Sequence, residues 1–320
     1  MQPLAGQLVV DLTRYLPGVY AARELLRLGA RVVRVEAPGG DPLRTAVPSW
    51  HATLAAGTES VVCDLHSDIA FAQALCARAD VVLEGFRPRV AERLGIGPAD
   101  VPDRVVYCSI TGFGDSGPLA DRVGHDLNYL GFAGALEDTA PALPPLPIAD
   151  LAAGSLGAVT QILAALLERE QTGRGNRIVV SMTHRTHDLV EHRLGDDPSS
   201  RPLTGGLACY GIYACADGRH LTLAALEPRF FARFCELMDR PDLRERQYAE
   251  DQVALATELA GVVRGRTLAE WLAVCDGEPV CVGPVWTRAE AAAELGGPGP
   301  EAAETPGLGA QTEAWRAALA

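Results

Sequence analysis

The stretch that decides the fold is QLVVDL at residues 7–12, which is followed by a helical segment at 19–28 and a second apolar run, RVVRV, at 31–35. Apolar and β-branched residues run almost continuously through both short segments, as expected of strands that are covered on both faces of a sheet. A strand, a helix and another strand in this order predict a βαβ unit with parallel strands. The chain therefore opens with the repeating unit of a doubly wound α/β sheet.

The same alternation continues to about residue 110. Further strands are expected at 60–65, 81–84 and 104–110, with a helix at 68–78 between the first two. In open parallel sheets, ligands bind outside the carboxyl ends of the strands. The segments 84–87 and 111–117 follow two such ends, and they are predicted to line a binding site.

A second, smaller domain is predicted after a polar linker, DDPSS, at residues 196–200. A hairpin with its turn at Asp217-Gly218 opens this domain. The expected elements are strands at 210–213 and 220–225, helices at 229–238, 252–264 and 268–275, and a strand at 280–285. We therefore predict a large Rossmann-like domain at 1–195 and a small α+β domain at 196–284. Residues 296–310 are rich in Gly, Pro, Ala and Glu, and we expect a loose tail there.

Composition excludes several classes of partner. The chain has 320 residues, enough for one large or two ordinary domains. Its 48% hydrophobic and 22% charged residues are typical of a soluble globular protein. A net charge of −13 gives no electrostatic footprint for nucleic acid or an anionic membrane. A phosphorylated ligand would have to be held by local cations and backbone N–H groups.

Cysteine usage and targeting signals favour the cytoplasm. The eight cysteines show no CxxC spacing, which favours reduced thiols over disulfides or zinc. Residues 1–15 lack the apolar segment of a signal peptide, and the apolar run 151–167 contains polar residues, which favours a buried core helix over a membrane span. No metal site is predicted, because His184, His187, Glu191 and His192 approach helical spacing without forming HExxH.

Three short segments carry the candidate chemistry: GHDLNY at 124–129, Asp150 before the long apolar helix, and LEPRFF at 226–231. A neutral imidazole at His125 can take up and return a proton near pH 7. Asp150 has an ordinary alternative as an N-cap, worth about 1 kcal/mol, and that role is compatible with proton transfer. Glu227 is either a surface residue at a helix start or the carboxylate partner of a histidine.

Four further motifs occur in the same order along the chain. They are VVDLTRYLPG at 9–18, LGARVVRVEAPGGDP at 28–42, VLEGFRP at 82–88 and TGFGDSGP at 111–118. Together with GHDLNY, this colinear set resembles the family III CoA-transferases of CaiB/BaiF type, and within them the α-methylacyl-CoA racemase branch. The resemblance runs from about Leu8 to Trp286.

The resemblance implies a racemase or epimerase of 2-methylacyl-CoA thioesters, with the acyl-CoA as substrate and no cofactor. His125 and Asp150 would move the α-proton, and Glu227 would support the histidine. The family also implies an interlocked homodimer, in which residues 285–320 return to the large, CoA-binding domain. The implied CoA- and substrate-binding residues are Cys63, Asp64, Leu65, His66, Gly85, Phe86, Arg87, Arg93, Gly124, Asp126, Asn128 and Tyr129.

The sequence departs from the family where cations hold the CoA phosphates. The usual basic residues before the third strand are replaced by AAGTES at 55–60, a frequent Lys by His66 and a frequent Arg by Ala37. Two alternatives therefore stand beside the isomerase: a CoA transferase that uses Asp150 as a covalent nucleophile, and a repurposed, non-catalytic member that binds an acyl carrier. His125 and the run LTGGLACY at 203–210 match the racemase type, whereas transferases carry a Gly-rich run there.

Overall fold

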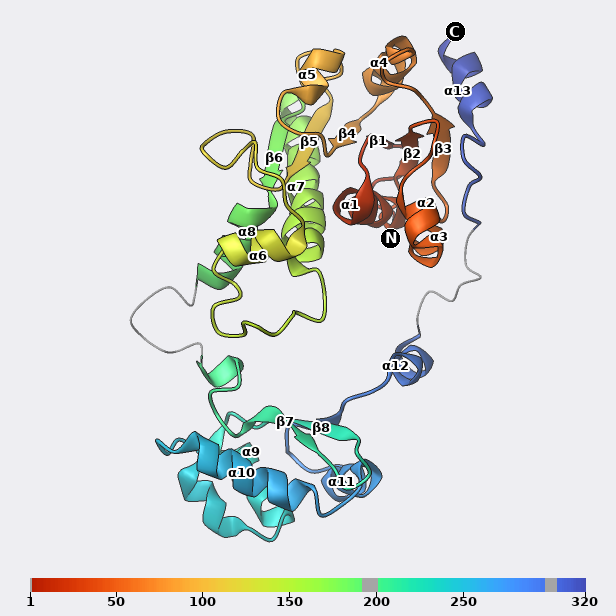
Figure 1. The fold of residues 1–320 in the computed structure, drawn as a ribbon. Helices are drawn as coiled ribbons and strands as arrows, with labels where there is room; N and C mark the ends of the chain where they lie inside the picture. Colours follow the sequence, from red (N-terminus) through yellow and green to blue (C-terminus); the bar gives the residue numbers. More distant parts are fainter. Residues whose placement is uncertain (1, 192–200, 297–303) are drawn as a thin grey trace. The chain divides into compact units, whose positions relative to one another are not determined.

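The computed structural model describes residues 2–191, 201–296 and 304–320 (Figure 1). The chain divides into two compact units, a large one of residues 1–191 with 298–320 and a small one of residues 192–297. The corresponding boundaries that we predicted lie after residues 195 and 284. The polar linker that we predicted at 196–200 lies outside the described residues.

The large unit is built on a six-stranded parallel sheet in the order β3-β2-β1-β4-β5-β6. Its strands are β1 (Leu8–Asp11), β2 (Arg31–Glu36), β3 (Glu59–Val62), β4 (Val81–Glu84), β5 (Val106–Thr111) and β6 (Arg177–Ser181). The predicted doubly wound α/β fold is confirmed. The strand order reverses between β1 and β4, and this switch point is where such sheets bind ligands.

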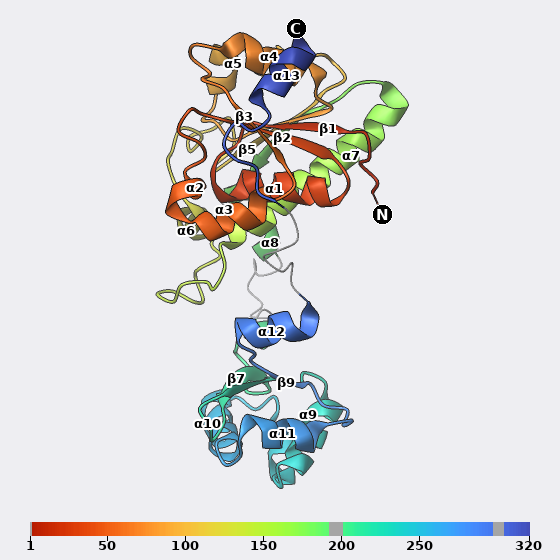
Figure 2. The same cartoon turned by 90° about the vertical axis from the view of Figure 1, so that its right-hand side faces the viewer.

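Helices cover both faces of this sheet (Figure 2). The helices of the large unit are α1 (Tyr15–Arg27), α2 (Leu43–Ala46), α3 (Pro48–Ala55), α4 (Ile69–Arg78), α5 (Val90–Leu94), α6 (Asp126–Phe132), η1 (Ala149–Leu156), α7 (Gly157–Thr172), α8 (Met182–Val190) and α13 (Thr312–Leu319). One apolar core joins the sheet to α1 and α7, and a second joins its other face to α4, α5 and α13. The turns at the strand ends are thereby anchored from both sides.

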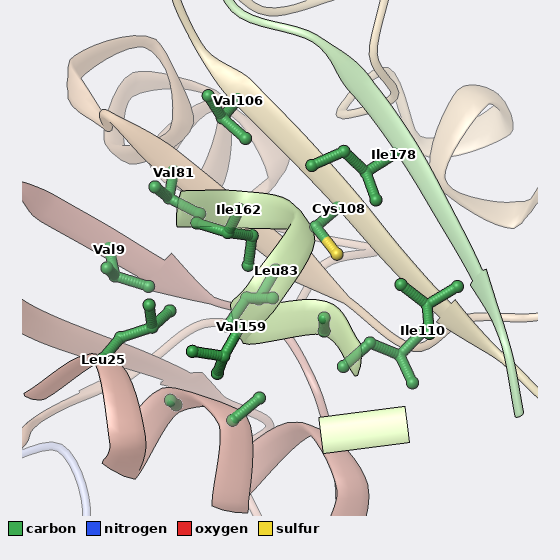
Figure 3. Packing of buried hydrophobic residues seen from close by; sticks show 14 of the residues in the cluster. Val9, Leu25, Val81, Leu83, Val106, Cys108, Ile110, Val159, Ile162 and Ile178 are labelled. Carbon is green, nitrogen blue, oxygen red and sulfur yellow. The ribbon is translucent and has the colours of Figure 1, made fainter. Parts of the chain in front are cut away.

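The long apolar segment Ala149–Thr172 has the length and composition of a membrane span. In the large unit it belongs to the core, as we predicted for residues 151–167. Val159 and Ile162 of α7 lie against strand residues such as Val9 and Leu83, and all four side chains are buried (Figure 3). Half of the most apolar window of this helix is buried inside the protein.

The C-terminal segment is bound along the free edge of β3. Our prediction of a loose tail at 296–310 is wrong for its described part, because Arg44 donates to the Pro306 carbonyl at 3.2 Å and the N–H of Gly309 donates to the Ser60 hydroxyl at 2.9 Å. Gln311 pairs with the backbone of Ser60 in both directions, with N–O distances of 2.8 and 3.0 Å. The hydroxyl of Thr312 accepts the N–H of Val62 at 2.9 Å. Composition gave no sign of this docking, because the contacts join residues about 250 positions apart in the chain.

The small unit carries a three-stranded antiparallel sheet in the order β7-β8-β9. Its elements are β7 (Tyr210–Ala214), β8 (His220–Ala224), β9 (Val282–Pro284), the 3₁₀ turns η3 (Arg201–Leu203) and η4 (Pro241–Arg246), and the helices α9 (Pro228–Leu237), α10 (Gln252–Val263), α11 (Leu268–Cys275) and α12 (Arg288–Leu295). We expected residues from 285 on to belong to the large domain. Instead α12 belongs to the small unit, where Glu290 pairs with Arg219 at 2.9 Å.

A buried ionic network joins the carboxyl ends of β1 and β2. The Arg34 guanidinium, 2% exposed, contacts Asp11 at 3.3 Å, Asp41 at 2.7 Å and Nε2 of His51 at 3.2 Å. Because arginine only donates, this His51 nitrogen must be the acceptor and the ring neutral. The second oxygen of Asp11 accepts from the backbone and hydroxyl of Thr13 at 2.9 and 2.6 Å. The network therefore fixes the turn after β1.

Replacing the central cation should be costly. We predict that Arg34→Met lowers the free energy of unfolding by about 3–5 kcal/mol, because Asp11 and Asp41 would remain buried without their counter-ion. Arg31→Met on the same strand is the control, since Arg31 is 60% exposed and pairs with Glu59 at the surface; it should cost under about 1 kcal/mol. Urea unfolding of both variants measures the difference, and equal losses would contradict the assignment.

Candidate active site

Two adjoining cavities open at the switch point of the large sheet. One, of about 530 Å³, contains His125, Asp150 and Arg87 in its wall. The other, of about 610 Å³, is lined by Cys63, His66 and other side chains. Both share the turn after β1 and the turn after β4 as walls. The large unit thus places its cavities where the reversal of strand order leaves a crevice.

Most residues implied by the resemblance lie in these walls. The first cavity is lined by Gly85, Phe86, Arg87, Gly124, His125, Asn128, Tyr129 and Asp150, and the second by Cys63, Asp64, Leu65, His66, Gly85, Phe86 and Arg93. Asp126 lines neither cavity, but its carboxylate accepts the N–H of Asp150, which lines the first. Glu227 belongs to the small unit.

Two arginines of the site were not predicted from the sequence. Arg14 lines both cavities and Arg122 lines the first, together with the predicted Arg87. All three side chains are exposed. The signal for Arg14 was present, because it follows the first strand directly, at the predicted binding edge. These cations give the cavities a local positive lining in a chain of net charge −13.

His125 stands immediately before α6 as its N-cap residue. Its backbone N–H is accepted by the Asn128 side chain at 3.1 Å, while the N–H of Asn128 donates to the His125 carbonyl at 2.8 Å. This reciprocal pairing fixes the backbone on which the imidazole is carried. The imidazole is exposed on the cavity wall and is therefore accessible to a ligand.

Tyr129 packs behind the histidine in space that two glycines leave open. Its hydroxyl donates to the Gly124 carbonyl at 2.5 Å. A Cβ at Gly112 would lie 2.5 Å from the Tyr129 ring, and one at Gly124 would lie 3.0 Å from it. Glycine is therefore required at Gly112 for this ring to reach its place.

Asp150 is in the first turn of η1, not at its N-cap as we predicted. The helix begins one residue earlier, with Ile148 as its cap, and no side chain caps it. The carboxylate of Asp126 instead accepts the N–H of Asp150 at 2.9 Å. η1 is a π-helix, a form that is common at functional sites. Its carbonyl groups are therefore placed differently from those of α7. The Asp150 carbonyl accepts a hydrogen bond from the Ser155 hydroxyl at 2.9 Å.

The electrostatics of the site make Asp150 a weaker acid than an ordinary aspartate. Burial, and secondly the nearby charge of Asp126, raise the pKa of Asp150 from 3.8 to about 7. Burial also raises the pKa of Asp126. A carboxyl group that titrates near neutral pH can both accept and donate a proton. Asp150 therefore has the titration behaviour that a proton carrier needs, and it is not the N-cap residue of η1.

Another buried carboxylate supports the wall between the cavities. Glu84 ends β4 and accepts the N–H of Phe86 at 2.6 Å. Its burial raises its pKa to about 7. In the second cavity, burial raises the pKa of the Cys63 thiol to about 11, so this cysteine is no nucleophile at neutral pH.

Glu227 is the N-cap residue of α9, followed by Pro228. It is exposed, and its carbonyl accepts the N–H groups of Phe230 and Phe231 at 3.0 and 3.2 Å. The predicted position at a helix start is confirmed, while its pairing with His125 stays a prediction. Within the described part of the chain, no group of three or more His, Cys, Asp or Glu side chains is arranged to hold a metal ion.

These features place the large unit among the α/β proteins that bind a ligand at the switch point of their sheet. The model of the CoA-transferase family III matches residues 4–295. Human alpha-methylacyl-CoA racemase is 34% identical over 307 residues, which cover 90% of this chain and 78% of the racemase. A probable fatty acyl-CoA transferase of Mycobacterium tuberculosis is 32% identical over 332 residues, 90% of this chain and 84% of that protein.

A crystal structure of the same mycobacterial protein matches the fold with a TM-score of 0.82 at 27% identity, covering 98% of this chain and 99% of that one. The chain therefore belongs to the CoA-transferase family III, as its motifs predicted. This family contains both racemases and CoA-transferases.

The charge of Asp126 should be measurable in the titration of Asp150. We predict that Asp126→Asn lowers the Asp150 pKa below about 7, because a like charge is removed. The pKa should stay above 3.8, since burial is the larger cause. The amide oxygen of Asn can still accept the Asp150 N–H, so the helix start is kept. Carboxyl ¹³C NMR titration, assigned with Asp150→Asn, measures the shift; an unchanged or higher pKa would refute the coupling.

Proposed function

We propose that this protein is a racemase or epimerase of 2-methylacyl-CoA thioesters, acting by removal and return of the α-proton. The observation that carries this proposal is that His125 and Asp150 line one cavity of about 530 Å³, with an Asp150 pKa near 7. The similarity to alpha-methylacyl-CoA racemase supports it. A repurposed carrier-binding protein would not need two proton carriers in one cavity.

In the proposed reaction, the α-carbon of the thioester lies between His125 and Asp150. One of the two removes the α-proton, and the electron pair moves onto the thioester oxygen as an enolate. The other then delivers a proton to the opposite face of the carbon, and the thioester carbonyl re-forms. The thioester itself acidifies the α C–H bond, so we propose that no metal or redox cofactor takes part; positioning and stabilisation of the enolate oxygen supply the rate.

We further propose that Glu227 supports the imidazolium of His125 in an interlocked homodimer, as the family resemblance implies. We propose a cytoplasmic location from the cysteine pattern. A carboxylate partner fixes the tautomer of an imidazole and stabilises its cation. Glu227 fits this role in one respect, since it is exposed at the start of α9.

The second candidate is a CoA transferase in which Asp150 attacks the thioester carbonyl and CoA leaves as its thiol. The similarity to a probable fatty acyl-CoA transferase favours it. The pKa near 7 favours neither candidate, because proton abstraction and nucleophilic attack both use the carboxylate form of Asp150. The racemase-type residues His125 and LTGGLACY at 203–210 speak against the transferase.

The two proton carriers can be separated by substrate stereochemistry. With (2R)- and (2S)-2-methylacyl-CoA in D2O, we predict that the wild type racemises both and exchanges their α-protons, also in EDTA. His125→Ala and Asp150→Ala should each lose racemisation by about 10²–10⁴-fold, while each keeps exchange of a different enantiomer. NMR of the α-position reads both. Normal racemisation by Asp150→Ala would reduce Asp150 to a structural residue, and a hydroxylamine-sensitive adduct on Asp150 would favour the transferase.

Binding of the carrier should depend strongly on Arg87. With Ala37 and His66 in place of the usual cations, each remaining phosphate contact carries more of the binding, at about 1.5–3 kcal/mol for a charge-assisted hydrogen bond. We predict that Arg87→Ala weakens free CoA by about one to two decades, and that wild-type affinity falls with salt. Arg89→Ala in the same turn is the control, because Arg89 pairs with Asp121 at the surface at 2.9 Å. Calorimetry that finds equal affinity in all three proteins would argue against CoA as the carrier.

A further inference from the structure

The carbonyl of Leu226, next to Glu227 in the chain, is held by two side chains from one loop. Gln247 donates to it through Nε2 at 2.7 Å, and the hydroxyl of Tyr248 donates to it at 2.5 Å. Gln247 also donates to the carbonyl of Ala225 at 3.1 Å. Three donated hydrogen bonds thus converge on the two residues that precede Glu227.

Burial shows that Gln247 is built into the small unit. It is 3% exposed, and a buried amide is stable only when it is hydrogen-bonded. Gln252 anchors the same loop, since its Nε2 donates to the carbonyls of Gln247 and Ala249 at 3.1 and 2.6 Å. The loop is therefore a rigid support for the backbone at Leu226.

Tyr248 differs from Gln247 because its side chain is 59% exposed. Its hydroxyl nevertheless points back to Leu226 and lies near enough to Glu227 to be affected by its charge. Burial first, and then the charges of Cys209 and Glu227, raise the pKa of Tyr248 above its ordinary value. The phenol therefore stays protonated, and remains a donor, throughout the physiological pH range.

Glu227 combines an exposed side chain with a backbone that is held in place. Its side chain is exposed, while its backbone is fixed on one side by α9 and on the other by the contacts at Leu226. A carboxylate that must meet an imidazole at hydrogen-bond distance works best when its backbone is held in advance.

We propose that Gln247 and Tyr248 are positioning residues, which hold the Leu226 carbonyl and so set the place of the Glu227 carboxylate. This inference rests on the proposed racemase function, in which Glu227 supports His125. Neither residue has to touch substrate. Substitution of Gln247 or Tyr248 should slow only the proton transfer that His125 carries out, because the proposed role of Glu227 is to support His125 and not Asp150.

Tyr248→Phe is the test, because it removes one hydroxyl from an exposed ring, whereas replacement of buried Gln247 would disturb the core. Initial α-proton exchange is measured separately for (2R)- and (2S)-2-methylacyl-CoA in D2O. The enantiomer that His125→Ala no longer exchanges identifies the histidine face. Tyr248→Phe should slow that exchange by about three- to tenfold, the range of one neutral hydrogen bond, and leave the other enantiomer within about twofold.

Two further comparisons separate positioning from loss of stability. Tyr213→Phe is the matched control, since Tyr213 donates to the Ala208 carbonyl at 2.5 Å in the same unit but is buried; it should lower the melting temperature without favouring one enantiomer. In a Glu227→Gln background, Tyr248→Phe should add no further loss, because both changes act through one carboxylate.

The outcomes are distinct. Equal slowing of both enantiomers by Tyr248→Phe, or full additivity with Glu227→Gln, would overturn the inference while leaving the racemase function in place. If the wild type exchanges neither enantiomer, the proposed function fails, and the positioning role fails with it. Slowing confined to the histidine face, abolished in the Glu227→Gln background, supports the role.

Discussion

The buried guanidinium of Arg34 is the constraint on which the site depends. A charge removed from water must be matched closely by partners, and here Asp11, Asp41 and His51 supply them. Asp11 in turn holds Thr13, and so determines where the chain leaves β1 and enters α1. Since that turn forms a wall of both cavities, the electrostatics of the interior fix the shape of the ligand-binding edge.

At that edge, positively charged side chains and a carboxyl group with a raised pKa line the same cavity. Arg14, Arg87 and Arg122 provide a positive lining for an anionic ligand. Asp150 lies on the same cavity wall, yet burial and Asp126 keep its pKa near 7. Because this pKa is higher in the folded than in the unfolded state, ionisation of Asp150 lowers stability as the pH rises from about 4 to about 7. Such a cost is typical of groups placed for chemistry and not for stability.

Much of this arrangement could be predicted from the sequence, because it depends on local pattern. Short Val-rich runs such as RVVRV at 31–35 are typical of buried strands, and their alternation with helices predicts the parallel sheet. The cavity residues of GHDLNY at 124–129 could also be predicted, because they form one short motif in the sequence. By contrast, β6 was missed although RIVVS at 177–181 carries a strand signal, because α8 follows it without a loop. The contact of Asp126 with Asp150 spans 24 positions, and no local pattern encodes such a distance.

The docking of residues 304–320 along β3 also has a consequence for how the chain is made. An open edge strand invites pairing with other chains, and here the groups that close it, on Gln311 and Thr312, are made about 250 residues after the strand they cover. Synthesis proceeds from the N-terminus, so the first sheet is complete in strands long before its edge is covered. The whole small unit is translated in that interval. The unpaired backbone groups of β3 therefore stay exposed in the nascent chain while more than 100 further residues are added. A chaperone would be of most use during that interval.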